Sequence, residues 1–208
     1  MTPEEFIISG ASSPDDLIGM AGKVSRVQVR KASKNTAGTP IKLLLYGEPG
    51  CGKSETAKCI SEALSPVGQR NRLSGQHLTA DDIRSWIEDT KYSQQSWIIW
   101  VIEEVDSLSK AAQTLILQYM DQMGPFHALI CTSNCDLDHL SDRFQSRFQT
   151  IEVKRPQAEE VANFISGRWA IDYDMAFEIA EANYCDVRAS LNDAQMELDM
   201  QEYGEASA

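Results

Sequence analysis

The chain has 208 residues, of which 31 are Asp or Glu and 19 are Lys or Arg, so its formal charge at neutral pH is −12. Hydrophobic residues make up 42% of the chain and charged residues 24%, ordinary values for one or two globular domains with a sizeable core. The excess of acid excludes a protein whose whole surface is basic, as in many nucleic-acid-binding domains.

The sequence lacks the usual signals of export and membrane insertion. The longest unbroken apolar run, residues 97–102, is far shorter than the roughly 20 residues that span a bilayer. The N-terminal segment begins with Glu4 and Glu5 instead of the basic stretch of a secretory signal. The 5 cysteines lack the paired CxxC spacing of zinc sites, which favours reduced thiols. We therefore expect a soluble, cytoplasmic protein without membrane partners.

Short apolar runs separated by helix-like stretches indicate the fold class. The runs are continuous rather than alternating, which is typical of a parallel sheet with helices on both faces. The expected strands are residues 41–46, 97–102, 128–131 and 151–153. The expected helices between them are residues 52–64, 81–90 and 109–123, whereas residues 9–16 and 31–40 are expected to be loops. This alternation predicts a doubly wound α/β domain.

The pattern changes after residue 153, and only helices are expected from there on. Pro156 follows the last apolar run and ends it. The expected helices are residues 157–168, 175–182 and 187–203. We therefore expect a boundary near Pro156, with an α/β nucleotide-binding domain at residues 1–155 and a helical domain with an acidic end at residues 156–208.

A phosphate-binding loop is the strongest motif in the sequence. It satisfies GxxxxGK(S/T) between an expected strand and an expected helix, where backbone N–H groups and the helix N-terminus bind phosphates. Lys53 is expected to reach the β- and γ-phosphates of ATP, and the Ser54 hydroxyl to bind Mg²⁺. The expected nucleotide contacts are Gly47, Glu48, Pro49, Gly50, Cys51, Gly52, Lys53, Ser54 and the next residue, Glu55.

Two adjacent acids, Glu103 and Glu104, follow the apolar run at residues 97–102. A buried strand that ends in two acids is the Walker B arrangement, in which the first acid helps to hold Mg²⁺ and the second polarises the attacking water. Together with Lys53, these residues predict ATP hydrolysis. A GTPase is disfavoured because no NKxD motif follows the loop, and a small-molecule kinase because the C-terminal helices are acidic instead of Arg-rich.

In this order the motifs resemble those of the AAA+ ATPases. Within them, the chain is similar to the clamp-loader group, which includes replication factor C small subunits and the bacterial DNA polymerase III γ/τ and δ′ subunits. The resemblance extends over about residues 14–198. It implies a P-loop NTPase core of the RecA type, with a three-layer parallel sheet, followed by a small, truncated, all-helical lid.

The resemblance implies roles for five further residues. Ile18 and Gly19 match the segment whose backbone lines the adenine pocket. Asn134 matches sensor 1, the polar group that lies near the γ-phosphate. Arg147 matches the SRC-motif arginine, which acts on the ATP of a neighbouring subunit, and Arg188 matches sensor 2, which reaches from the lid to the phosphates. The implied assembly is a homo- or hetero-oligomer with DNA or a DNA-bound protein as its partner.

The sequence also departs from the family pattern. Glu48 stands where Pro is usual, Cys51 where Thr is common, and Glu103 where Asp is usual. The helix expected at residues 109–123 lacks the arginines with which family members couple hydrolysis to DNA. Clamp loaders continue with a helical collar, for which this chain leaves no room.

These features lead to one main functional hypothesis and two alternatives. The main hypothesis is an ATPase that hydrolyses ATP at subunit interfaces, with Lys53, Glu104 and Arg147 as catalytic residues and Ser54 and Glu103 as the Mg²⁺ ligands. The first alternative is a nucleotide-dependent assembly module with little hydrolysis. The second is a compact phage or mobile-element helper for replication or transposition.

The charge of −12 is distributed unevenly along the chain. Residues 172–205 hold many acids and Arg188 as their single base, which favours a phosphate-sensing role for that arginine. Residues 17–47 hold no acid but six bases, of which Arg26 and Arg30 are four residues apart and would share one face of a helix. These bases are Lys23, Arg26, Arg30, Lys31, Lys34 and Lys42.

Overall fold

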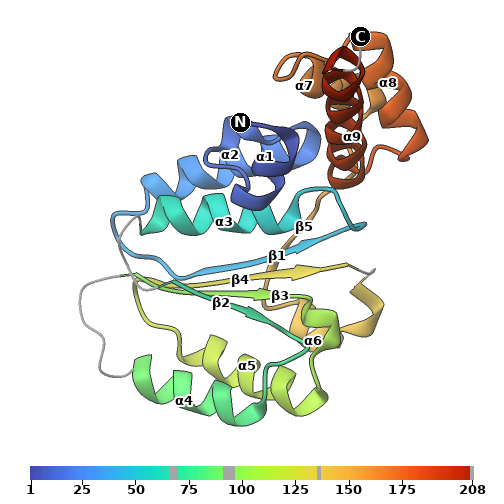
Figure 1. Cartoon of the computed structure of the whole chain (residues 1–208). Helices are drawn as coiled ribbons and strands as arrows, with labels where there is room; N and C mark the ends of the chain where they lie inside the picture. Colours follow the sequence, from blue (N-terminus) through green and yellow to red (C-terminus); the bar gives the residue numbers. More distant parts are fainter. Residues whose placement is uncertain (66–69, 91–96, 135–136, 207–208) are drawn as a thin grey trace.

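A five-stranded parallel sheet lies between two layers of helices in the computed structural model, which describes residues 1–65, 70–90, 97–134 and 137–206 (Figure 1). The strand order is β2-β3-β4-β1-β5. The strands are β1 (Ile41–Tyr46), β2 (Arg70–Ser74), β3 (Ile98–Glu103), β4 (His127–Ser133) and β5 (Gln149–Glu152). No helix among the described residues has the length and apolar character needed to cross a membrane.

Helices cover both faces of the sheet (Figure 1). One layer holds α2 (Gly19–Ser33) and α3 (Lys53–Leu64), which pack against each other, and the other holds α4 (Ala80–Thr90) and α5 (Lys110–Gln122). Short helices complete this part of the chain: η1 (Pro14–Asp16), η2 (Val105–Ser107), η3 (Leu137–His139) and α6 (Asp142–Gln145). The α/β fold predicted from the alternating pattern is confirmed.

The continuous apolar runs are explained by the two cores on either side of the sheet. Successive side chains of a strand point to opposite faces, so Leu43 and Leu45 join the core beneath α2 and α3, whereas Leu44 joins the core beneath α4 and α5. In the second core the rings of Trp86 and Trp100 are stacked with centroids 4.0 Å apart. Full burial of each such side chain contributes about 1.5–3 kcal/mol, so both helical layers are firmly held.

The observed elements differ from the expected ones mainly where the sequence is polar. Strand β2 was not expected, because its sequence RNRLS lacks an apolar run and this edge strand pairs with β3 alone. Residues 9–16, expected to be a loop, include η1, and α2 extends to Ser33 into the other expected loop. The exposed cations of α2 are interspersed among its buried residues, so the sequence shows no clear apolar pattern there.

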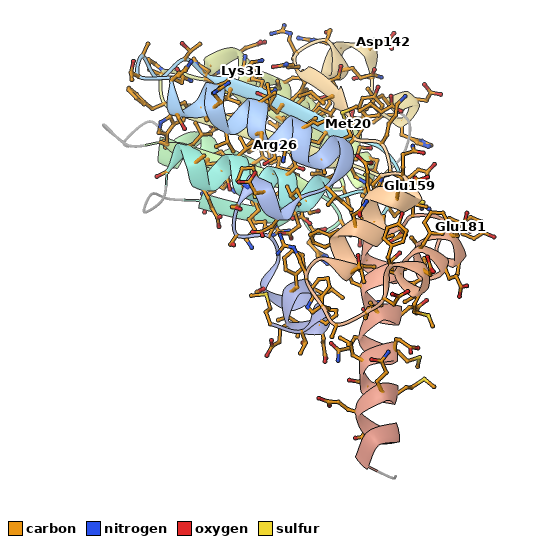
Figure 2. All side chains as sticks on the ribbon, turned by 90° about the horizontal axis from the view of Figure 1, so that it is seen from above. Met20, Arg26, Lys31, Asp142, Glu159 and Glu181 are labelled. Atoms are coloured by element: carbon orange, nitrogen blue, oxygen red, sulfur yellow. The ribbon has the colours of Figure 1, made fainter. Side chains whose placement is uncertain are left out.

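Three C-terminal helices form a third core beyond one end of the sheet (Figure 1). They are α7 (Ala158–Ser166), α8 (Tyr173–Ala182) and α9 (Val187–Ala206), and α9 projects away from the rest of the molecule (Figure 2). The N-terminal helix α1 (Pro3–Ser9) packs against α9. Through Phe6, whose ring lies 5.6 Å from that of Phe164, the two ends of the chain share one apolar cluster.

Candidate nucleotide-binding site

The candidate site is a cavity of about 350 Å³ at the carboxyl ends of β1, β3 and β4. Ligands of open α/β sheets bind at this edge, where the strands give way to loops. The cavity has two parts of different chemistry. Its polar half comprises Pro49, Gly50, Cys51, Gly52, Lys53, Ser54, Glu55, Glu103, Glu104, Thr132, Asn134 and Arg188. Its apolar half comprises Phe6, Ile7, Ala11, Leu17, Ile18, Ala21, Phe164, Val187 and Leu191, and Gly10 and Asp16 complete the lining.

The loop between β1 and α3 wraps around the start of the helix through glycines with positive φ angles. Gly50 has a φ of 76°, and a Cβ atom there would collide with the carboxylate of Asp186 at the start of α9. Gly47, with a φ of 144°, passes so close to the Val153 carbonyl that a side chain would not fit. The loop therefore needs glycine both for its backbone conformation and for its close approach to neighbouring segments.

Lys53 lies at the first turn of α3 and is only 5% exposed. Its Nζ atom donates hydrogen bonds to the carbonyl oxygens of Gly47 (2.9 Å) and Glu48 (2.7 Å), so the ammonium group lies within the loop. Burial lowers the pKa of Lys53 and raises the pKa of the neighbouring Cys51 thiol. The N-terminus of α3 adds its own positive potential, so this end of the cavity favours an anion.

Glu103 ends β3 and contacts two side chains. The Ser54 hydroxyl lies 3.4 Å from its Oε2 atom, and Arg72 of the unexpected strand β2 forms an ion pair with its Oε1 atom. The structure therefore brings together the hydroxyl and carboxylate that the motifs assign to Mg²⁺. Oxygen donors of this kind suit that ion. Arg72 was missed by sequence reasoning because β2 itself was missed.

Glu104 follows with a left-handed backbone, φ 56° and ψ 51°. Asn134 Nδ2 donates to its Oε1 atom at 3.2 Å, and Gln76 Nε2 donates to its Oε2 atom at 2.7 Å. The Glu104 N–H group contacts the Thr132 hydroxyl at 3.3 Å. Two amides from different strand ends thus orient one carboxylate, which suits a group that must hold a water molecule in a defined position.

The helical segment contributes Arg188 to the cavity although this residue is far from Lys53 in sequence. It lies in the first turn of α9, where Asp186 caps the helix by accepting from the Ala189 N–H at 3.0 Å. Among the described residues, Arg188 has no ion-pair partner within 4.0 Å. Its charge is therefore available to an anion in the cavity.

Several other expected contacts occupy the edge of the site. Ile18 lines the cavity, whereas its neighbour Gly19 packs against Pro156 and Glu160. The Glu55 carboxylate accepts from the Ala11 N–H at 2.8 Å and so ties α3 to the segment after α1. The side chain of Glu48 points to solvent and pairs with Arg155 at 2.7 Å.

The apolar half of the cavity contains residues that sequence reasoning missed, above all Phe6 and Ile7 of α1. A signal for α1 was present, because Thr2 and Glu5 form a capping box and Pro3 occupies the first helical position. Nothing in the sequence indicated that this helix would pack beside Phe164 and Leu191. An apolar wall of this kind can hold the flat face of a nucleotide base.

Arg147 lies outside the cavity that holds Lys53. It forms an ion pair with Asp121 and lines a second cavity of about 500 Å³ together with Lys31 and Lys42. Burial and the nearby Arg147 charge lower the pKa of Lys42, whose Nζ atom donates to the Met120 carbonyl at 2.7 Å. Arg147 therefore belongs to a different surface of the chain from Lys53.

Comparison with known proteins places this site in a family. Residues 43–155, more than half of the chain, match the model of the ATPase family associated with various cellular activities (AAA). The chain is also 28% identical over 158 residues to Lon protease of Cytophaga hutchinsonii. That match covers 61% of this chain and 19% of the relative, so the chain spans about a fifth of that relative's length.

The fold is similar to that of solved structures of RuvB from Thermotoga maritima. Three single-residue variants of that protein superpose with TM-scores of 0.78, 0.79 and 0.79 at 20% sequence identity. Each match covers 94% of this chain and 67% of the RuvB chain. The matched family model, which includes the phosphate-binding loop, Glu103, Glu104, Asn134 and Arg147, shows that the chain belongs to the AAA ATPase family.

Proposed function

We propose that the cavity binds ATP with Mg²⁺ and hydrolyses the γ-phosphate. The observation that supports this most strongly is the convergence of Lys53, Ser54, Glu103, Glu104 and Arg188 on one cavity from three separate segments, the start of α3, the end of β3 and the start of α9. In this proposal the polar half of the cavity holds the triphosphate, and the apolar half, including Ile18, holds the adenine ring.

Ser54 and Glu103 are the proposed metal ligands. Their oxygen atoms lie 3.4 Å apart at the end of β3, and a hydroxyl with a carboxylate is a donor set typical of Mg²⁺. When bound, Mg²⁺ would neutralise charge on the β- and γ-phosphates. The protein's part is to hold both oxygens on rigid elements, the start of α3 and the end of β3.

Glu104 is the proposed general base. Asn134 and Gln76 hold its carboxylate, so an attacking water bound there would be oriented before reaction. Lys53 and Arg188 are the proposed partners of the negative charge that moves onto the phosphoryl oxygens and the leaving group. Each of these roles belongs to a residue whose position is held by a hydrogen bond or a helix start.

The proposed hydrolysis involves more than one subunit. AAA+ proteins commonly oligomerise, and Arg147 lies outside its own cavity with its side chain 39% exposed. We propose that Arg147 acts on the ATP of a neighbouring subunit, as the clamp-loader resemblance implies, and that DNA or a DNA-bound protein is the partner.

We also propose residues 1–155 and 156–208 as the two domains, since the third core involves mainly α7, α8 and α9.

A second candidate function is a nucleotide-dependent assembly module with little hydrolysis. The ion pair between Glu103 and Arg72 favours it, because Arg72 competes with a metal ion for the same carboxylate. In that case ATP binding would change the oligomeric state, and replacing Glu104 would leave this change intact.

A mixing experiment separates these candidates. Glu104→Gln and Arg147→Ala subunits should each hydrolyse ATP at least about 100-fold more slowly than the wild type, since each lacks a group needed in the transition state. In a mixture, an Arg147→Ala subunit keeps Glu104 and receives Arg147 from a Glu104→Gln neighbour, so part of the turnover returns. Arg84→Ala, which removes an exposed arginine outside the cavity, is the matched control.

Two outcomes would contradict the main proposal. Turnover that is independent of protein concentration and survives Arg147→Ala would exclude action on a neighbouring subunit. Nucleotide-dependent assembly without measurable turnover in the wild type would favour the assembly module. Light scattering and phosphate release, measured on the same samples, distinguish the two.

A further inference from the structure

Helix α2 carries an exposed row of cations, none of which lines the cavity that holds Lys53. One side of the helix, including Val24, Gln28 and Ala32, is buried. The opposite side is defined here as the basic face of α2, and its five members are all exposed. They are Lys23, Arg26, Arg30, Lys31 and, at the C-cap, Lys34.

This face is nearly free of compensating acid. No Asp or Glu occurs between residues 17 and 47. In the part of the chain that the structure describes, Asp15 is the one carboxylate that forms an ion pair with the basic face, 3.7 Å from Arg26. Both partners are exposed, so this pair is worth little. The charges of Lys23, Arg30, Lys31 and Lys34 therefore face solvent together.

Helix stability does not account for the arrangement. The helix dipole favours cations in the last turn, which explains Arg30 and Lys31. It favours acids in the first turn, where α2 has none, and it gives no reason for cations at Lys23 and Arg26. Lysines and arginines three and four residues apart repel one another, which is unfavourable for the helix. The row thus lowers the stability of the helix unless it binds something.

The geometry of the row fits a phosphate backbone. Lys23 and Lys34 are separated by eleven residues of helix, roughly 16 Å at the usual rise of 1.5 Å per residue, and a DNA duplex presents several phosphates over that length. Figure 2 looks down on this layer, with Met20, Arg26 and Lys31 labelled along α2. The helix has no aromatic side chain on which unpaired bases would stack, which favours a duplex over a single strand.

A protein partner fits the same face less well. The centre of a protein–protein interface is usually apolar and depleted in lysine. On the side of α2 that carries the basic face, Val27 is the one exposed large hydrophobic residue, with 51% of its surface accessible to solvent. The strongest competitor is the acidic helix α9 of a second copy, which carries Asp193, Glu197, Asp199 and Glu202 beside the exposed Met196, Met200 and Tyr203.

We propose that the basic face of α2 binds the phosphate backbone of duplex DNA without reading its sequence. The inference deepens the proposed function by assigning the DNA contact to a surface, and it does not depend on hydrolysis. The acidic α9, which projects away from the rest of the molecule (Figure 2), would repel the duplex and so favour one orientation of the protein on it.

The test compares two triple variants with the same change in net charge. Lys23→Gln/Arg30→Gln/Lys34→Gln alters the basic face and leaves Lys31, which lies beside Arg147, unchanged. Arg84→Gln/Lys110→Gln/Lys154→Gln removes three exposed cations elsewhere and is the matched control. Binding of a short fluorescein-labelled duplex of mixed sequence is followed by anisotropy at salt concentrations from about 50 to 200 mM. The same strand without its complement is a second probe.

We expect the basic-face variant to bind the duplex at least about tenfold more weakly at low salt, and the control to stay within about threefold of the wild type. The slope of log affinity against log salt should also fall by up to about 2.7, or about 0.9 for each lost phosphate contact. The single strand should bind more weakly than the duplex.

Three outcomes would overturn the inference. They are equal losses in the two variants, tighter binding of the single strand, and unchanged DNA binding combined with lost self-association of the basic-face variant. The last would identify the face as a dock for α9 of a second copy. Binding of a fluorescent ATP analogue is measured in parallel, so that a failure of the nucleotide site is seen separately from a failure of the DNA surface.

Discussion

The polar and apolar halves of the cavity are built in different ways. The polar half comes mainly from residues 49–55, at the end of the phosphate-binding loop and the start of α3, and from the ends of two neighbouring strands. The apolar half joins α1, the segment before α2, and helices α7 and α9, which come from opposite ends of the chain. The first depends on local backbone conformation, whereas the second depends on how distant segments pack. Substitutions in the polar half should therefore mainly change nucleotide affinity, whereas substitutions in the apolar half should mainly change the free energy of unfolding.

The largest effect is expected in the polar half, from Lys53→Ala. Loss of a buried ammonium group from the proposed triphosphate site should weaken nucleotide binding on the order of 100-fold. The thermal midpoint should change little, because burial already disfavours the charged form and lowers the pKa of Lys53. Titration with a fluorescent ATP analogue measures the affinity, with Lys110→Ala as the control for an exposed lysine. Equal affinities for the two variants would contradict the assignment.

Gly50→Ala tests the close approach of the phosphate-binding loop to the residue that precedes α9. The φ angle of 76° disfavours alanine, and its Cβ atom would collide with the Asp186 carboxylate at the start of α9. We expect nucleotide affinity to fall by about 30-fold, equivalent to about 2 kcal/mol of backbone strain and displacement. Calorimetric titration measures it. Adding Asp186→Ala should restore part of the loss, and strictly additive effects would show that the collision does not matter.

Phe6→Ala tests the apolar half. The ring lies 5.6 Å from that of Phe164 and 6.1 Å from that of Trp169, with the Arg168 guanidinium 5.4 Å from its centre. Because Phe6 is only partly buried, we expect a loss of about 2 kcal/mol in unfolding free energy, less than for a core phenylalanine. Urea denaturation measures this loss. Ile8→Ala on the same helix is the control, since Ile8 is 79% exposed, and a similar loss there would contradict the packing role of Phe6.

The smallest effect is expected at Asp16, which joins the segment before α2 to Arg168 after α7. Burial opposes ionisation, but hydrogen bonds from Arg168, Ser12 and Ser13 outweigh it and lower the pKa of Asp16 from 3.8 to about 2. The carboxylate's contribution to stability is complete above pH 3.8 and is lost as the pH falls through about 2.

Asp16→Asn should therefore lower the unfolding free energy by about 1 kcal/mol at neutral pH, after allowance for solvent screening. The difference from the wild type should vanish near pH 2. Urea denaturation across this pH range measures both quantities. A constant difference at all pH values would show that shape, and not charge, is what Asp16 contributes.

The sequence allowed prediction of those parts of the site that are local. Gly47, Lys53 and Ser54 lie within one short segment, the loop after β1 and the first turn of α3, whose glycines and flanking elements can be recognised from the local sequence alone. The acids after β3 follow from the same reasoning. Strand β2 and its Arg72 could not be predicted, because an edge strand pairs on one side only and needs no apolar run.

Taken alone, the sequence determined the α/β fold, the phosphate-binding loop and the uneven charge of the chain. These depend on hydrophobic periodicity, glycine conformation and residue counts, which are properties of short segments. Only the tertiary structure decided that Phe6 and Arg188 line the same cavity, that Arg147 lies outside it, and that Arg72 pairs with Glu103. These contacts join segments far apart in the chain, and they arise from packing, which no local pattern encodes.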